Sequence, residues 1–196
     1  MIFPSLDRVK AIAPGYDIVP VYMEILSDVR TPISVLKALK QVSSHTYLLE
    51  SADNSNHWGR YSFLGYDPKI ELFCKNHQMT IKDGTTRTFE CSDPAAEIRN
   101  ILSQYKSPRL EELPTFTGGF VGYCACEYIR YIEPTLDFPT PDDDSAMVND
   151  VDLMLFDKVI AFDHYKNKIY LIANISTNDL ERNYNKAELE LKALAD

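Results

Sequence analysis

Long hydrophobic runs are absent from this chain of 196 residues. A membrane-spanning helix needs about 20 apolar residues, and the longest candidate segment, residues 151–162, is interrupted by Asp157. The amino terminus has no apolar core followed by small residues, so it does not resemble a cleaved signal peptide. We therefore expect a cytoplasmic protein with no membrane partner.

Cysteine and clustered basic residues are also scarce. The four cysteines, Cys74, Cys91, Cys124 and Cys126, are too few for a disulfide framework in a chain of this length. We predict that they are reduced and mostly packed inside the fold. Acidic residues outnumber basic ones by 29 to 20, and no Lys/Arg cluster stands out. Because contacts to phosphates supply most nucleic-acid affinity, the sequence indicates no nucleic-acid partner.

The motifs of common catalytic sites are missing as well. The sequence has no G-x-S-x-G elbow, no Walker loop and no H-E-x-x-H helix. Four histidines, His45, His57, His77 and His164, stand singly in turn-like contexts, so we predict solvent-facing rings. The acidic run 142–144 lacks the alternating ligands of a calcium loop and predicts a solvated loop. We expect no catalytic residue and no metal ion in this chain.

Helical and extended patterns follow one another along the chain, as is typical of an α+β fold. The capping residues Ser5, Thr31 and Asp93 begin three helices, and two more are expected at residues 127–132 and after Asn178. Extended patterns predict strands at residues 16–26, 46–51, 61–66, 70–75, 79–82, 85–90, 151–162 and 168–175, and a buried strand in the glycine-rich segment after residue 116. We expect an antiparallel β-sheet with helices on its outer face.

Polar side chains gather where the predicted strand 46–51 ends. Glu50 and Ser51 follow an apolar run, and Arg60 comes shortly afterwards. The simpler interpretation is a strand that ends in two solvated polar groups. The functional interpretation is a pocket for a zwitterion, in which the carboxylate and the hydroxyl accept hydrogen bonds from an ammonium group and Arg60 serves the anionic end. The residues alone leave both interpretations open.

Several motifs in series resemble one enzyme family. They are PVYMEIL (residues 20–26), LLESAD (48–53), GRYSFLGYDP (59–68), GGFVGYCACEYIRYIEP (118–134) and DLMLFDKVIAFDH (152–164). In this order they resemble the amino-terminal domain of component I of anthranilate synthase. The resemblance implies one such domain over residues 1–196, forming half of that family's layered α+β sandwich. It also implies regulatory and scaffolding roles, with the catalytic carboxy-terminal domain absent.

The complete enzyme of that family is a lyase of tryptophan biosynthesis. It converts chorismate and ammonia to anthranilate and pyruvate, and a glutamine amidotransferase subunit, component II, supplies the ammonia. The family's Mg²⁺ and chorismate sites lie in the carboxy-terminal domain, so the resemblance implies no cofactor and no catalysis by this segment.

The family's amino-terminal domain carries most of the site for allosteric feedback inhibition by tryptophan. When the motifs are carried over to this chain, Glu50 and Ser51 bind the α-amino group of tryptophan and Leu49 lines the indole wall. Pro20 contributes from the preceding segment, and Arg60 is a further candidate near the ligand. The resemblance thus assigns five ligand-binding residues.

Two other hypotheses remain open. Component I of aminodeoxychorismate synthase, from folate biosynthesis, has an amino-terminal domain of the same architecture, although LLES and GRYSFLG favour the anthranilate enzyme. A stand-alone, non-catalytic binding module would have kept the fold and lost catalysis. The resemblance also implies an open apolar face where a second domain would pack, so we expect the isolated chain to self-associate.

Overall fold

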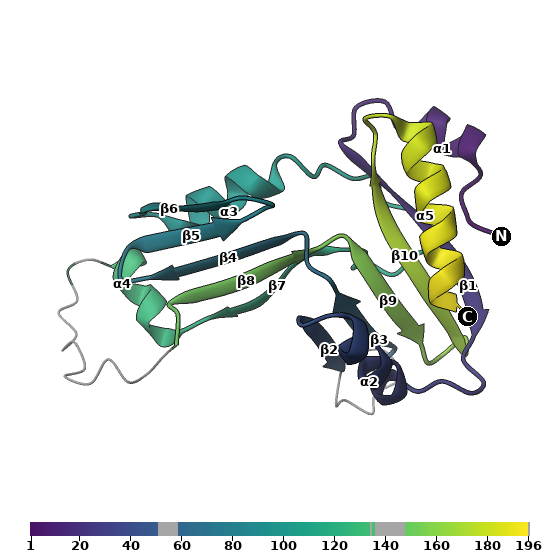
Figure 1. The fold of residues 1–196 in the computed structure, drawn as a ribbon, viewed down its shortest axis with the longest axis horizontal. Helices are drawn as coiled ribbons and strands as arrows, with labels where there is room; N and C mark the ends of the chain where they lie inside the picture. Colours follow the sequence, from purple (N-terminus) through teal and green to yellow (C-terminus); the bar gives the residue numbers. More distant parts are fainter. Residues whose placement is uncertain (51–58, 134, 136–147, 196) are drawn as a thin grey trace. The chain divides into compact units, whose positions relative to one another are not determined.

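Two five-stranded antiparallel sheets organise the described part of the chain (Figure 1). The computed structural model describes residues 1–50, 59–133, 135 and 148–195. Its chain divides into two compact units, the first made of Met1–Pro68, Gln104–Gly119 and Phe156–Asp196, the second of Lys69–Ser103 and Phe120–Leu155. The predicted α+β class is confirmed, but the single predicted sheet is two sheets.

The first unit holds a sheet with the strand order β1-β10-β9-β3-β2. Its elements are α1 (Leu6–Ile12), β1 (Ile18–Leu26), α2 (Pro32–Val42), β2 (Thr46–Glu50), β3 (Tyr61–Tyr66), β9 (Lys158–Asp163), β10 (Lys168–Ser176) and α5 (Leu180–Ala195). β1 and β2 are therefore the two edge strands. Pro20 lies on β1, at the edge position that the sequence predicts for it, where a missing backbone N–H is tolerated.

The second unit holds a sheet with the strand order β6-β5-β4-β8-β7. Its elements are β4 (Ile70–Lys75), β5 (Gln78–Lys82), β6 (Thr86–Glu90), α3 (Pro94–Leu102), β7 (Gly119–Cys124), the 3₁₀ turn η1 (Cys126–Tyr128), α4 (Ile129–Ile132) and β8 (Val151–Phe156). The predicted strand 151–162 is wrong as one element, because β8 pairs with β4 whereas β9 pairs with β3 and β10. Asp157 lies at the break, where its carbonyl accepts hydrogen bonds from both the backbone and the side chain of Asn174.

Helix capping follows the sequence closely. The side chains of Ser5, Thr31 and Asp93 each accept a hydrogen bond from the backbone N–H three residues later. Such caps satisfy N–H groups that have no partner within the helix. The three predicted helix starts are therefore confirmed.

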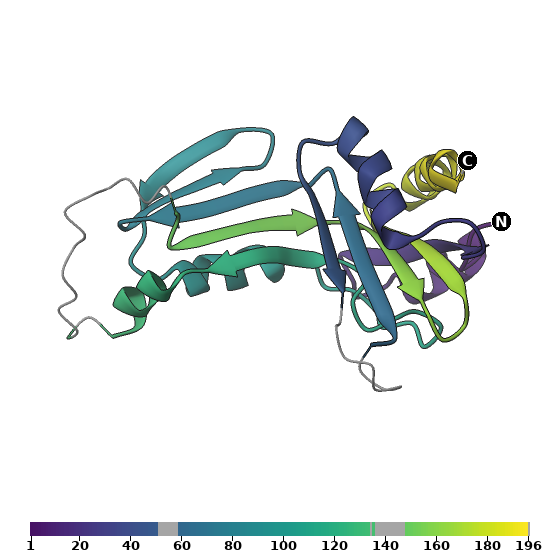
Figure 2. The same cartoon turned by 90° about the horizontal axis from the view of Figure 1, so that it is seen from below.

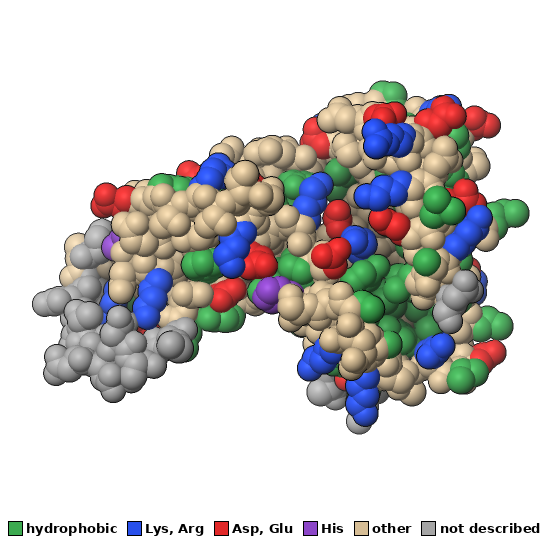
Figure 3. Space-filling model, viewed as in Figure 1, with side chains coloured by type: hydrophobic (Ala, Val, Ile, Leu, Met, Phe, Trp, Pro, Cys, Tyr) green, Lys and Arg blue, Asp and Glu red, His purple; other side chains and the backbone are tan. Residues whose placement is uncertain are grey.

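Helices cover one face of the first sheet. Val9 of α1, Leu39 of α2 and Leu191 of α5 belong to one core with the side chains of the sheet beneath them. Figures 1 and 2 show α5 lying along β10 and β1, with α2 beside β2 and β3. In the space-filling view of Figure 3, hydrophobic side chains are visible between α2 and α5. The opposite face packs against Leu110 and Leu113 from the segment that follows α3.

The glycine-rich strand differs from its prediction in one respect. β7 is an edge strand, and its last three residues are exposed, so the predicted buried strand is wrong. The predicted close backbone approach is confirmed, because a side chain at Gly122 would collide with the carbonyl of Asp152. The cysteines are free, as predicted, but only Cys74 and Cys91 are buried.

Candidate functional site

A short chain of polar side chains lies where β2 and β9 end and β3 begins. Glu50 is the last residue of β2 and is exposed, and it pairs across the ladder with Ser62 of β3. The Ser62 hydroxyl donates to Oε1 of Glu50 at 3.4 Å, and its oxygen lies 2.7 Å from Nε2 of His164. His164 follows β9 directly. The structure therefore joins Glu50 to two polar side chains that the sequence analysis did not assign to the site.

Leu49 lies on the other face of the sheet from Glu50. Successive side chains of a strand point to opposite faces. Glu50 shares its face with Ser62, its cross-strand partner, whereas Leu49 pairs with Phe63, which packs against the opposite core. Leu49 is 47% exposed. The two predicted ligand residues therefore do not line one surface within β2.

Pro20 lies far from Glu50 in the same sheet. The row of paired residues that contains Glu50 crosses the sheet to Ile25 of β1, by way of Ser62, Phe162 and Ile169. Pro20 is five residues along β1 from Ile25. Typical spacings place it about 19 Å across the sheet and about 17 Å along it from Glu50. Pro20 and Glu50 are therefore not neighbours within the first unit.

Arg60 is paired within the chain. Its Nε and Nη2 atoms donate to Oδ1 and Oδ2 of Asp163 at 3.1 and 2.7 Å, which is the two-bond geometry that holds a guanidinium in place. Its guanidinium also lies over the rings of Tyr61 and Tyr165. The side chain of Arg60 is 35% exposed and that of Asp163 is fully buried. Arg60 thus has its anionic partner already, which weakens its assignment to a ligand.

Asp163 is a buried carboxylate that is fully supported. Burial alone would raise its pKa, but hydrogen bonds from Arg60 and from the backbone N–H groups of Lys166 and Tyr165 outweigh burial and lower the pKa of Asp163. The carboxylate therefore stays ionised and closes the turn between β9 and β10. His164 lies in that turn.

Ser51, the remaining predicted ligand residue, lies outside the described residues, as do His57 and the acidic run 142–144. Within the described residues, no group of three or more His, Cys, Asp and Glu side chains is arranged to hold a metal ion. None of the helices in that part of the chain is long and apolar enough to cross a membrane.

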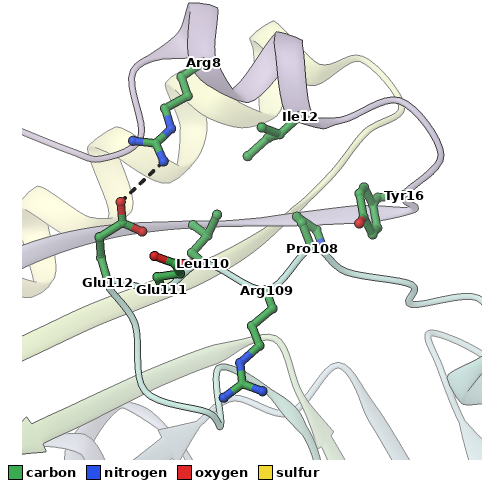
Figure 4. A pocket seen from close by; sticks show the side chains of 8 residues that line it. All are labelled: Arg8, Ile12, Tyr16, Pro108, Arg109, Leu110, Glu111 and Glu112. Carbon is green, nitrogen blue, oxygen red and sulfur yellow. Dashed lines mark hydrogen bonds and ion pairs between the residues drawn. The ribbon is translucent and has the colours of Figure 1, made fainter.

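A groove of about 410 Å³ lies elsewhere in the first unit, between α1 and residues 108–112 (Figure 4). Arg8 and Glu112 form an ion pair of 3.3 Å across it, while the Arg109 side chain points away from Arg8. Both members of the pair are about half exposed, so water screens their attraction. The groove contains none of the five predicted ligand residues.

No protein-family model matches the chain. It is 35% identical over 197 residues to anthranilate synthase component 1 of Acetivibrio thermocellus, covering 99% of this chain and 39% of that protein. It is 39% identical over 185 residues to anthranilate synthase component 1 of Acinetobacter calcoaceticus, covering 92% of this chain and 37% of that protein.

The chain is a homologue of anthranilate synthase component I. The crystal structure of anthranilate synthase component I from Streptococcus pneumoniae matches it with a TM-score of 0.51 and 27% identity, covering 86% of this chain and 36% of that one. The chain thus spans little more than a third of the length of the anthranilate synthase proteins it matches.

Sequence reasoning about this anthranilate synthase homologue missed His164. His164 is exposed, as predicted, but its Nε2 atom also contacts the buried hydroxyl of Ser62. Ser62 and His164 are 102 positions apart, so no local pattern joins them. The available signal was the polar Ser62 between the apolar residues of β3, since a buried hydroxyl needs a partner.

Proposed function

We propose that this chain is the tryptophan-binding feedback domain of an anthranilate synthase component I. The complete enzyme would convert chorismate and ammonia, the latter delivered by a component II subunit, to anthranilate and pyruvate. Homology along 99% of the chain supports this assignment. The structural observation that carries the regulatory part is the carboxylate of Glu50, exposed at the end of β2 and held by Ser62.

The chemistry of this corner suits the amino group of an amino acid. An ionised carboxylate only accepts hydrogen bonds, and Glu50 has a second oxygen that Ser62 does not occupy. An ammonium group bound there forms a charge-assisted hydrogen bond, which is stronger than a neutral one. Ser51 follows Glu50 directly in the sequence and carries a hydroxyl, a second hydrogen-bonding group for the ligand in the proposal. These two residues hold the charged head of tryptophan in the proposal.

Feedback follows when tryptophan binds two conformations of the complete enzyme unequally. A differential affinity of about 1 to 3 kcal/mol is enough to change chorismate binding about 5- to 150-fold. The Mg²⁺ and the chemistry of the reaction belong to the part of the family enzyme that this chain does not cover. The residues of this chain then act by binding tryptophan and passing its binding energy to that part.

Substitutions in the complete component I test the proposal. Ser51→Leu removes an acceptor and fills the pocket, and Glu50→Gln removes the charge. Both are expected to abolish or strongly weaken inhibition by tryptophan while anthranilate formation from chorismate continues. Glu90→Gln is the matched control, because Glu90 is also an exposed glutamate that ends a strand. Inhibition curves of the Ser51 and Glu50 variants that superimpose on wild type would refute the assignment.

The same assay separates the proposal from its rivals. Formation of anthranilate from chorismate supports the anthranilate enzyme, whereas formation of aminodeoxychorismate supports the folate enzyme. For the isolated chain we expect weak or unmeasurable tryptophan binding by calorimetry, because the family's pocket is completed by its second domain. Tight binding by the isolated chain would favour a stand-alone binding module.

An open apolar surface is also part of the proposal. Large exposed hydrophobic side chains occur at the end of β1, in the connection that follows it and on α2, namely Leu26, Val29, Ile33 and Val42. Monomeric proteins rarely leave extended apolar patches uncovered. Light scattering of the isolated chain is expected to show self-association that increases with concentration, and a strict monomer at high concentration would contradict this.

A further inference from the structure

Ser62 is a buried hydroxyl with a charged neighbour on one side and a ring nitrogen on the other. The residue is 2% exposed, the only serine among the described core residues. Its oxygen lies 2.7 Å from Nε2 of His164 and 3.4 Å from Oε1 of Glu50. Ser62 therefore connects the imidazole of His164 to the exposed carboxylate at the end of β2.

The number of protons fixes the direction of these hydrogen bonds. A serine hydroxyl has one proton to donate, and an ionised carboxylate can only accept. When Ser62 donates to Glu50, it must accept from Nε2 of His164. In this arrangement Nε2 of His164 carries the proton that it donates to Ser62. The chain runs from His164 as donor, through Ser62, to Glu50 as final acceptor.

The position of His164 is itself fixed by the fold. Its ring stacks on Phe162, with centroids 6.4 Å apart and planes 22° apart. Its backbone N–H donates to the carbonyl of Arg60 at 2.9 Å. The buried carboxylate of Asp163 holds the turn by accepting from the N–H groups that follow His164. The donor end of the chain is thus set by contacts that involve no ligand.

We propose that Ser62 and His164 are positioning residues for the recognition of an amino acid's ammonium group by Glu50. This inference rests on the proposed function. Ser62 donates to Oε1 of Glu50, and no hydrogen bond to Oε2 comes from the described residues, so the proposal assigns Oε2 to the ligand. Orienting the carboxylate before the ligand arrives removes side-chain ordering from the cost of binding. Glu50 on an exposed strand end would otherwise sample several rotamers.

Three variants of the complete component I test the positioning role. Ser62→Ala removes the link and is expected to raise the inhibition constant for tryptophan about tenfold, as expected for loss of one hydrogen bond to a charged group. His164→Ala is expected to have a smaller effect in the same direction. His164→Gln keeps a nitrogen donor at a similar distance from the backbone, so it is expected to restore inhibition to within about threefold of wild type.

A second measurement on the chain itself reads the hydrogen bonds directly. Nitrogen NMR of the wild-type imidazoles is expected to show His164 protonated on Nε2, with a slowly exchanging proton. In Ser62→Ala this proton is expected to exchange quickly with water. A structural role alone would change stability without fixing the tautomer. A His164 ring protonated only on Nδ1 would overturn the proposal.

The outcomes separate this inference from the proposed function. If Glu50→Gln leaves tryptophan inhibition unchanged, the proposed function fails, and the positioning role fails with it. If Glu50→Gln weakens inhibition but Ser62→Ala and His164→Ala do not, only the positioning role is overturned. Weakening by Ser62→Ala and His164→Ala, with recovery in His164→Gln, supports both.

Discussion

Each unit has a short hydrogen-bond chain that ends at a carboxylate. The carboxylate is the exposed Glu50 in the first unit and the buried Asp150 in the second. Asp150 is 8% exposed, and its Oδ2 atom accepts from the backbone N–H of Asn76 at 2.9 Å and the hydroxyl of Tyr131 at 2.7 Å. The Tyr131 oxygen in turn accepts from the N–H of His77 at 3.0 Å. Glu50 is exposed and is supported from one side by Ser62.

This difference in burial shows which of the two hydrogen-bond chains is accessible to a ligand. In the second unit, two donors from the chain itself bond to Oδ2 of the buried carboxylate, and burial raises the pKa of Tyr131, so its phenol stays protonated as a donor. Such a closed chain stabilises the turn between β4 and β5. In the first unit the last acceptor faces water. The same chemistry therefore serves stability in one unit and, in our proposal, recognition in the other.

The largest expected effect on stability comes from removing the carboxylate of Asp150, and the matching change at Glu50 is its comparison. Asp150→Ala leaves the Asn76 N–H and the Tyr131 hydroxyl without their acceptor, and we expect it to lower the free energy of unfolding by about 3 kcal/mol. Glu50→Ala is expected to change it by less than about 0.5 kcal/mol, because the side chain is exposed. Urea unfolding of the chain measures both. Equal losses of unfolding free energy in the two variants would contradict the contrast between Asp150 and Glu50.

A smaller effect is expected when only the phenol is removed. Tyr131→Phe keeps the ring beside His77 but removes one donor and one acceptor, so we expect a loss of about 1 to 2 kcal/mol. Hydrogen exchange at the His77 amide should also become faster. Tyr165→Phe is the control, since Tyr165 is 78% exposed. A His77 amide that exchanges at the wild-type rate would contradict the closed chain.

The pH dependence of the free energy of unfolding should show that the ionised carboxylate of Asp163 stabilises the first unit. Its pKa is lower in the folded chain than the unfolded value of about 3.9, so its contribution to stability is present above about pH 4. That contribution is lost as the pH falls through the lowered pKa. The stability difference between wild type and Asp163→Asn should therefore shrink in urea titrations from pH 5 to pH 2. A difference that does not change with pH would refute the role of the charge.

The smallest expected effect is at Tyr47, whose hydroxyl is buried without a partner among the described residues. Tyr47→Phe removes this hydroxyl and keeps the edge-to-face contact with Phe156. We expect the free energy of unfolding to stay the same or to rise by up to about 1 kcal/mol. Thermal unfolding beside Tyr131→Phe measures the contrast. A loss as large as that of Tyr131→Phe would show that the phenol has a partner after all.

Helices and most strands could be predicted because their signals are local. Thr31 and Pro32 predict a helix to residue 42, and α2 runs from Pro32 to Val42. The capping hydrogen bond joins Thr31 and Ser34, three residues apart, so the helix start is set by nearby chain geometry. Strand partners are not local. β8 and β9 form one extended pattern in the sequence, and their pairing with different sheets divides that pattern into two strands.

The candidate site divides in the same way. The sequence pattern of β2 predicts that Glu50 lies at the end of the strand. Because side chains alternate along a strand, it also predicts that Leu49 points to the face opposite Glu50. The pairing of Arg60 with Asp163 could not be predicted, because the two residues are 103 positions apart and meet only when β3 and β9 pair. The assignment of Glu50, Ser51, Leu49, Pro20 and Arg60 to tryptophan remains a prediction.

By itself, the sequence determined where helices begin, which segments are extended and which family the motifs resemble. These properties depend on residues a few positions apart and on the order of the motifs. Three features became visible only in the tertiary structure. The strands form two sheets, Pro20 and Glu50 lie on opposite edge strands of the first sheet, and His164 contacts Ser62. The physical reason is that β-sheet register brings together residues about a hundred positions apart, and no local propensity encodes that choice.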